Sequence, residues 1–463
     1  MDITVIKRLI KKYSMGHADF LTKAQEGRRY YRGDTDILYK ADKEDETDNP
    51  LRTADNRIPT NWQSLLVDQK AAYMFTFPPL FDVGTESNNK RITEVLGDEF
   101  PKVCKDLCIE ASNTSIGWLH CWIDTDNKFQ YAVVPSEQII PIFSSDLKKR
   151  LIAVLRVYNR IDEETGDRFT VYEYWNDKEC YAYQVPAGDI VEESLTEYNM
   201  FTNFIVDTGA TELSNNYPHN FGEVPFIPFY NNNINTNDLK KVKKFIDVYD
   251  NVFSGFVNDL DDIQEVIFVL TNYGGENLKD FLKQLKLHKV IDMQSDGVDE
   301  KTGLETIKID IPVEARDKVL TICEKQIYKQ GQGVDPNPEA FGNSSGVALE
   351  YLYSLLELKA GLTETEFRLG FAKLVRIVCK QLNIPIGNII QTWTRNKIRN
   401  DTELVENCQK SKGIISDETI IKNHPFVDNP EDEIKKMKEQ TEANTPFQDK
   451  VPLEDVNEDE EEQ

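Results

Sequence analysis

The stretch NDLKKVKKFIDVYDNVFSGFVNDLDDIQEVIFVL, residues 237–270, contains no proline and a single glycine. Its apolar side chains recur every three or four residues, which places them on one face of an α-helix: Leu239, Val242, Phe245, Tyr249, Val252, Phe256, Leu260, Ile263 and Ile267. At about 1.5 Å per residue, a helix over the whole stretch is about 50 Å long. The pattern therefore predicts a helix far longer than the average of about 11 residues.

A helix of this length needs packing partners along most of its surface. A lone compact domain rarely offers so long a groove, whereas side-by-side copies in an oligomer do. Further along the chain, residues 313–330 predict another helix, and residues 347–382 a very long one with kink sites at Gly361 and Gly370. Two strand-like segments, 289–294 and 305–311, precede these helices and are joined by a turn-rich stretch.

The N-terminal half has a different pattern of apolar and polar residues. Helical spacing predicts helices over residues 3–26, within 61–77 and around 100–112. From Gly117 to about Val185 the apolar residues alternate, which predicts an antiparallel, half-exposed sheet with hairpin turns at DTDN and EETGD. A proline-interrupted extended segment, FGEVPFIPFYNNN, closes this region. Together these elements predict an α+β fold.

The chain carries 80 acidic and 54 basic residues, and its formal net charge is −26 over 463 residues. Such a surface repels nucleic acid and anionic membranes at long range, so any contact with DNA is not a tight grip everywhere. Residues 428–463 hold fourteen acidic and four basic residues, a net charge of 4 − 14 = −10, and end in a predicted disordered tail, EDVNEDEEEQ.

Seven scattered cysteines lack framework spacing, which indicates reduced thiols in a cytoplasmic compartment. No signal peptide or bilayer-length apolar run is visible, so we expect a protein that is soluble and intracellular at synthesis, without a membrane.

Residues 342–346, GNSSG, fit the G-x-S-x-G pattern of serine hydrolases, with Ser344 as nucleophile. That pattern needs a preceding strand, and Pro336 and Pro338 argue against a central one. Asp401 and His424 would supply the chain order Ser, Asp, His, but neither lies in a recognisable turn. Ser344 or Ser345 as the N-cap of the following helix explains the same letters more simply.

Other catalytic and metal patterns are weak. Cys104 and Cys108, with His120 and Cys121, are faintly zinc-like, but small buried thiols are the favoured interpretation. DTDN lacks the glycine and distal glutamate of a calcium loop, and no GxxxxGK[ST] motif occurs. We expect no enzyme, no metal and no cofactor.

One basic feature stands out. Lys279, Lys283 and Lys286 share one face of a predicted helix, and three leucines share another. The residues alone leave two interpretations open: an ordinary amphipathic surface helix, or a patch that meets an acidic partner.

Several of these stretches, in order, resemble the portal proteins of tailed double-stranded DNA phages, in the branch of siphophages of Gram-positive hosts. The stretches are YYRGDTDIL, NRIPTNWQSLLVDQKAAYMFTFPP, PSEQIIPIF, FGEVPFIPFYNNN with the helix after it, FGNSSGVALEYLYSLLELKA and KGIISDETIIKNHPFVDNPEDEI. No single motif is diagnostic, but the stretches together extend over nearly the whole chain and occur in the order expected for that family.

The resemblance implies a portal fold: a mixed α/β wing, two long stem helices, a small α/β clip, a long kinked tunnel helix and a helical crown, assembled as a ring of typically twelve subunits. Its expected segments are the wing at 1–235, a stem helix at 236–272, the clip at 273–312, the second stem helix at 313–335, the tunnel loop at 336–346, the long kinked helix at 347–383, and the wing end, crown and acidic tail at 384–463.

The resemblance also implies a function: a channel at the capsid vertex through which DNA is packaged and later ejected. The implied tunnel-loop residues facing DNA are Pro336, Asn337, Pro338, Glu339, Phe341, Asn343 and Ser344. The clip, with Lys279, Lys283 and Lys286, would dock the terminase large subunit and later a head-completion or adaptor protein. Major capsid and scaffolding proteins are further implied partners. The implied locations are the virion and, during assembly, the host cytoplasm.

Two alternatives stay open from the residues. One is another ring-forming neck or connector protein of the virion. The other is a serine hydrolase using Ser344.

Overall fold

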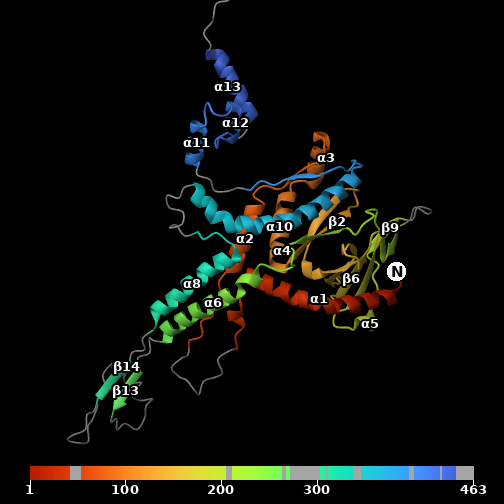
Figure 1. Cartoon of the computed structure of the whole chain (residues 1–463). Coiled ribbons are helices and arrows are strands. Elements are labelled where there is room, and N and C mark those ends of the chain that lie inside the picture. Colours follow the sequence, from red (N-terminus) through yellow and green to blue (C-terminus); the bar gives the residue numbers. More distant parts are fainter. Residues whose placement is uncertain are drawn as a thin grey trace, which may run out of the picture. The chain divides into compact units, whose positions relative to one another are not determined.

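The computed structural model describes residues 1–41, 54–204, 211–262, 267–271, 303–307, 311–336, 346–395, 401–427 and 430–444. It divides into two units (Figure 1): Met1–Asp335 with Tyr353–Asn396, and Pro336–Leu352 with Lys397–Gln463. Helices and antiparallel strands both contribute to the first unit, as an α+β fold requires. Within the described residues, no helix is long and apolar enough to cross a membrane.

The predicted N-terminal helices are confirmed. Asp2 caps the first one by accepting a hydrogen bond from the backbone N–H of Thr4 at 2.8 Å. A helix that was not predicted also forms, capped by Thr85. The helices of this region are α1 (Ile3–Tyr31), η1 (Asp36–Tyr39), α2 (Trp62–Met74), α3 (Glu86–Leu96) and α4 (Phe100–Thr114).

The predicted antiparallel sheet is present as two sheets. The smaller has the strand order β12-β2-β3, formed by β2 (Ile116–Ile123), β3 (Phe129–Val134) and β12 (Phe226–Tyr230). In this sheet β12 is an edge strand, which is where its Pro228 is tolerated. The larger has the order β11-β7-β6-β5-β4, with β8 also on β7; its strands are β4 (Ile139–Phe143), β5 (Leu151–Ile161), β6 (Arg168–Trp175), β7 (Glu179–Pro186), β8 (Thr196–Glu197) and β11 (Asn216–Pro218).

The DTDN stretch is a turn between β2 and β3, as predicted. Asp124 accepts hydrogen bonds from the N–H groups of Asp126 and Lys128, and Asn127 takes the left-handed conformation with φ of 59°.

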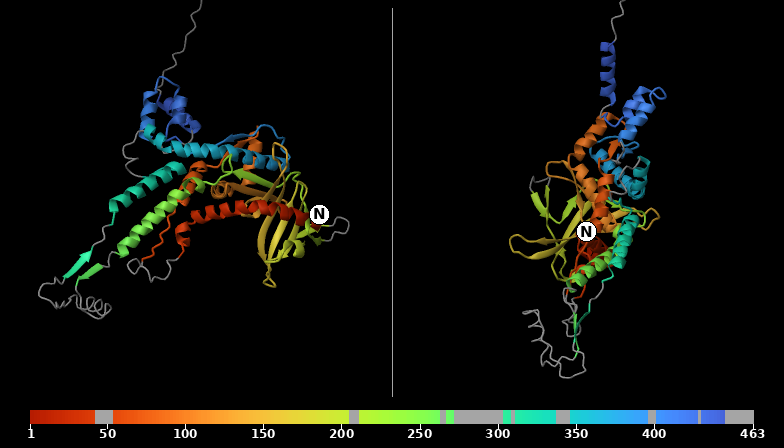
Figure 2. Two further views of the ribbon diagram at one scale, coloured as in Figure 1. Left: turned by 60° about the horizontal axis from the view of Figure 1, so that its bottom comes forward. Right: turned by 90° about the vertical axis from the view of Figure 1, so that its left-hand side faces the viewer.

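Helix α1 lies along the larger sheet (Figure 2), where Ile6 and Ile10 pack against Leu155 and Tyr183. Smaller elements complete the region: η2 (Ser136–Gln138), α5 (Val191–Ser194), β1 (Leu80–Asp82) paired with β15 (Ile390–Thr392), and β9 (Phe201–Phe204) paired with β10 (Thr211–Ser214).

Two helices far apart in sequence, α6 (Leu239–Asp262) and α8 (Val313–Gly331), lie side by side (Figures 1 and 2). Their apolar faces meet α2 and the end of α1 in one cluster of buried residues: Tyr30, Leu66, Leu239, Val242, Ile246, Ile327 and Tyr328. The predicted helix at 313–330 is therefore confirmed.

The prediction that the first long helix continues to Leu270 is wrong. Helix α6 is described to Asp262, and Ile267–Thr271 form strand β13, paired antiparallel with β14 (Gly303–Ile307). The run IFVLT is rich in β-branched and aromatic side chains, which favour a strand over a helix. The strand predicted at 305–311 begins two residues earlier, and the one predicted at 289–294 lies outside the described residues.

The very long predicted helix is confirmed as α10 (Gly346–Gln381). At Gly370 an added Cβ would lie 2.5 Å from the Phe229 ring, so this glycine permits close packing of α10 on β12. At Gly361 an added Cβ would meet nothing within 4 Å. Kinks at the two glycines remain predictions. The second unit contains α11 (Asp401–Lys410), α12 (Asp417–Asn423) and α13 (Pro430–Asn444), and the acidic tail lies outside the described residues.

The two glycines of α10 make a matched pair. Gly370→Ala should destabilise the fold by about 1–3 kcal/mol because the methyl group overpacks against Phe229. Gly361→Ala should leave stability unchanged or raise it by up to about 1 kcal/mol, because alanine is the better helix former. Thermal unfolding followed by circular dichroism measures both. A Gly370→Ala variant as stable as Gly361→Ala would contradict the close packing.

Candidate functional site

At the candidate site, the helix pair α6–α8 joins α2 and α10. Its centre is a group of buried polar side chains, here called the junction cluster: Lys70, Ser112, Asn231, Asp238 and Lys359. The Lys70 ammonium is completely buried and donates to Ser112 Oγ at 3.1 Å, to Asn231 Oδ1 at 2.5 Å and to Asp238 Oδ2 at 3.3 Å. Lys359 Nζ lies 3.0 Å from the same Asp238 oxygen.

Two ammonium groups share one carboxylate in this cluster, and that arrangement controls its charge. Burial acts to raise the pKa of Asp238, but Lys359 and Lys70 outweigh it and hold this pKa far below its usual range. Burial lowers the pKa of Lys359, and Asp238 partly offsets the shift. Because its pKa is lowered on folding, Asp238 contributes stability above its unfolded pKa of 3.8, and this is lost only in stronger acid.

The junction cluster joins segments that are distant in the chain. The Asp238 N–H donates to the Ser112 carbonyl at 2.8 Å, which fixes the start of α6 on α4. Lys359 also donates to the Gly331 carbonyl at 2.9 Å, which ties α10 to the last residue of α8. The Thr363 hydroxyl donates to the Asn231 carbonyl at 3.1 Å. Five elements therefore converge on one buried ionic group.

The chain leaving α8 is held equally closely. The Gln69 side chain on α2 pairs with the backbone of Val334: its amide donates to the carbonyl at 2.8 Å, and its oxygen accepts from the N–H at 3.0 Å. At Gly331 and Gly333 an added Cβ would lie 2.5 Å and 2.4 Å from the Leu66 side chain, so a larger residue would have to displace that leucine. These contacts anchor the base of the segment predicted as the tunnel loop.

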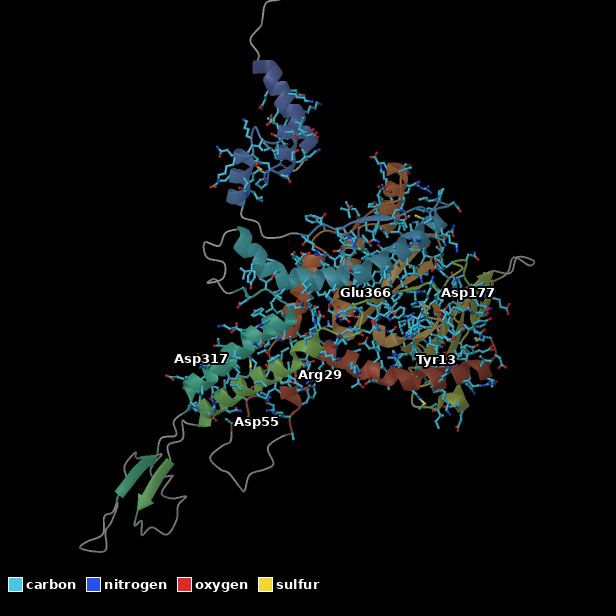
Figure 3. All side chains as sticks on the ribbon, viewed as in Figure 1. Tyr13, Arg29, Asp55, Asp177, Asp317 and Glu366 are labelled. Atoms are coloured by element: carbon cyan, nitrogen blue, oxygen red, sulfur yellow. The ribbon has the colours of Figure 1, made fainter. Side chains whose placement is uncertain are left out.

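The segment before α2, residues 54–60, runs along α6 and forms hydrogen bonds with it at regular intervals. Thr60 donates to Asp250 at 2.5 Å, the Ile58 N–H to Ser254 at 3.0 Å, and the Asn56 N–H to Asn258 at 2.6 Å. Two extended residues span about 6.6 Å and four helical residues about 6.0 Å. Every second residue of the extended segment therefore meets every fourth residue of α6. Figure 3 labels Asp55 at the far end of this run.

Ionic contacts continue on both sides of α6. Arg316 of α8 pairs with Asp259, and its guanidinium lies 5.7 Å from the centre of the Phe256 ring. Near the start of α6, Lys243 pairs with Asp36 and, at 3.0 Å, with Asp247. Burial opposes ionisation of Asp36, but Arg29 and Lys243 bring its pKa down to about 2. The helix pair is thus braced from its first turn to its last described turns.

Most of the implied site residues lie outside the described residues: Asn337, Pro338, Glu339, Phe341, Asn343, Ser344, Lys279, Lys283 and Lys286. Of the implied tunnel loop, only Pro336 is described. The two interpretations of the lysine face therefore both stay open. Asp401 begins α11 and His424 follows α12, while Ser344, their proposed partner, is not described.

The interpretation of the cysteines as buried thiols is confirmed. Cys104, Cys108 and Cys121 are free and buried, and burial raises their pKa values. The neighbouring His120 bonds through Nδ1 to the Pro225 carbonyl at 2.9 Å. Cys180, Cys323 and Cys379 are buried as well, whereas Cys408 is partly exposed. Across the described parts of the chain, no three His, Cys, Asp or Glu side chains gather as a metal site would require.

The junction cluster and Gln69 were not predicted from the sequence. A signal for Lys70 was present, because it lies three or four positions from Leu66, Val67 and Met74, on the apolar face of α2. Lys359 follows Leu356 by three positions on the buried face of α10. A charged residue on an apolar helix face indicates a buried ion pair, but nothing local identifies its partner.

Substitutions in the junction cluster should differ in cost. Asp238→Asn leaves two buried ammonium groups without a carboxylate, so we expect a loss of about 3–5 kcal/mol in the free energy of unfolding. Lys359→Met keeps the Lys70–Asp238 pair and should cost clearly less. Denaturant unfolding of both variants beside the wild type measures the difference. Equal losses would show that the shared carboxylate is not the critical member.

Comparison with known proteins identifies the family of this chain. The family model described as phage portal protein, SPP1 Gp6-like, matches residues 10–446. The portal protein of Clostridium phage phiCD119 is 40% identical over 447 residues, which cover 93% of this chain and 94% of that protein. The portal protein of Bacillus phage SPP1 is 31% identical over 456 residues, covering 95% of this chain and 86% of that protein.

Among solved structures, the neck of an empty gene transfer agent particle, computed with C6 symmetry, aligns over 78% of this chain and 88% of its own, at 10% identity and a TM-score of 0.46. A TM-score below 0.5 does not establish a shared fold, so the assignment rests on the sequence matches. Since these extend over nearly the entire length, the chain belongs to the family of SPP1 Gp6-like phage portal proteins.

Proposed function

We propose that copies of this chain form a ring around a central channel, and that double-stranded DNA passes through this channel into the capsid and later out of it. The observation that carries the proposal is the family match over residues 10–446. The two relatives named portal protein support it, since each aligns over more than nine tenths of this chain.

The braced helix pair supports a ring. A channel wall needs stiff elements, and the start of α6 is held to α2 and α10 by the buried pairs of Asp238 with Lys70 and Lys359. Arg316 pairs with Asp259 to join α8 to α6, and the run 54–60 bonds along α6. In this assignment α6 (Leu239–Asp262) is the first stem helix, shorter than the expected 236–272, and α8 belongs to the second, at 313–335. Helix α10 belongs to the long helix at 347–383. Residues 1–235 form the wing, 273–312 the clip and 384–463 the wing end, crown and tail.

The charge of the chain fits a passive channel. DNA has to slide over many base pairs, and many lysine–phosphate contacts would hold it in place. A net charge of −26 avoids that grip. The sequence has no P-loop motif, and in this proposal the protein conducts DNA without catalysis while a separate packaging ATPase supplies the energy.

In this proposal the chain docks a terminase large subunit at the clip through Lys279, Lys283 and Lys286, and later a head-completion protein. Capsid and scaffolding proteins surround the wing. The protein resides in the virion at the portal vertex, after assembly in the host cytoplasm. The tunnel loop at 336–346 faces DNA, and Gln69 and Lys359 fix its base by holding Val334 and Gly331.

The mass and shape of the purified protein test the ring. Native mass spectrometry with negative-stain images should give rings of about a dozen copies with a central hole, the closed symmetry of a heterologous assembly. Higher salt should favour assembly, because it screens repulsion between copies that each carry a charge of −26. A compact dimer with a closed interior would contradict the channel, and a ring without a DNA-sized hole would favour a connector protein instead.

The loop has its own test. Replacing residues 336–346 with a short glycine linker should leave ring assembly intact but reduce DNA packaging by at least about tenfold, since loop contacts with DNA are lost while the braced helices remain. In-vitro packaging of nuclease-protected DNA measures the effect. A control of equal length replaces residues of the tail, 453–463. Packaging at the wild-type level without the loop would refute its role.

A further inference from the structure

Helix α10 is apolar on two opposite sides. One side is the core face, where Phe367 and Phe371 are buried against Phe75 and Phe229. The other side carries four exposed leucines, here called the leucine row: Leu355, Leu358, Leu362 and Leu369, with exposed fractions of 39%, 56%, 58% and 69%. Figure 3 labels Glu366 on the same helix.

The spacing of the row is that of a helix-packing seam. Steps of three, four and seven residues cover fourteen residues, or two heptads, and Thr365 occupies the skipped position. An average interval of 3.5 residues keeps side chains facing one partner along the helix. Single exposed leucines are ordinary, but an aligned apolar row on a surface marks an interaction site.

A second, different row lies on the same unit. On α8, the exposed side chains of Val319 and Ile322, 38% and 51% exposed, follow Ala315 by four and seven residues. Asp317, labelled in Figure 3, lies within this segment. A closed ring requires two different surfaces on each copy, one for each neighbour, whereas a single foreign partner requires only one. The pair of rows therefore favours copies of this chain as the occupants.

The charge of the chain sets a requirement on such a contact. Each copy carries a formal net charge of −26, so association between copies works against long-range repulsion. Short-range apolar burial has to overcome it, and the leucine row offers that without charged side chains in the row itself. We propose that the leucine row of α10 is buried against a neighbouring copy of this chain, an inference that rests on the proposed ring.

The main test changes the row in the full-length protein. Leu358→Glu with Leu362→Glu places two carboxylates in the proposed contact, and the protein concentration at half-assembly should rise about 100-fold or more. The matched control, Leu147→Glu with Ile190→Glu, adds the same charge at two exposed positions outside helix α10 and should assemble like the wild type. Native mass spectrometry measures assembly, and circular dichroism should show unchanged folding in both variants.

A second measurement identifies what covers the row. A photo-crosslinking benzoylphenylalanine in place of Leu358 should give covalent dimers and higher multimers on irradiation of the wild-type-like ring. A crosslink within one chain, to residues 401–444, would overturn the inference because the chain's own second unit would then cover the row.

The outcomes separate this inference from the proposed function. If the wild type forms rings and the double glutamate variant forms them at the same concentration, the leucine row is not the contact, and the ring stands. If the wild type forms no rings at any concentration or salt, the proposed function and the inference both fail.

Discussion

The interior of this protein depends on one carboxylate. Asp238 balances the buried ammonium groups of Lys70 and Lys359, and each of these three side chains comes from a different segment of the chain. A buried charge without a partner costs several kcal/mol, so no segment can leave the arrangement without a large penalty. Segments held by hydrophobic contacts alone could shift along one another, whereas the buried ion pairs fix these three segments in one alignment. The start of α6 and the end of α8 are therefore positioned by electrostatics, with apolar packing filling in around them.

The extended run before α2 carries the same positioning along α6. Its contacts fall on Asp250, Ser254 and Asn258, one helical turn apart, and Arg316 joins α6 to α8 near the far end. These contacts fix α6 to the chain before α2 over residues 250–258. With them, the pair behaves as an extension of the N-terminal region. Such stiffness suits a channel wall, where a moving polymer pushes against the same surface repeatedly.

Periodicity predicted most helices and the antiparallel sheet because their apolar faces are continuous in sequence. It failed at Ile267–Thr271, since a short apolar run has no period of its own and only the partner strand β14 reveals its conformation. The junction cluster was not predictable in full, because Lys70 and Asp238 are 168 positions apart. The order of several sequence stretches along the chain indicated the family better than any single motif. The roles of the tunnel loop and of the lysine face of the clip remain predictions from that resemblance.

The burial of six thiols has a practical consequence for experiments on this protein. Cys104, Cys108, Cys121, Cys180, Cys323 and Cys379 are buried, and burial raises their pKa values, so little thiolate is present and reagents reach it slowly. Cys408, in helix α11, is the partly exposed one. A maleimide dye added to the natural protein therefore attaches mainly at one known point per chain. The chain carries its own labelling handle for fluorescence studies, and no cysteine has to be introduced or removed.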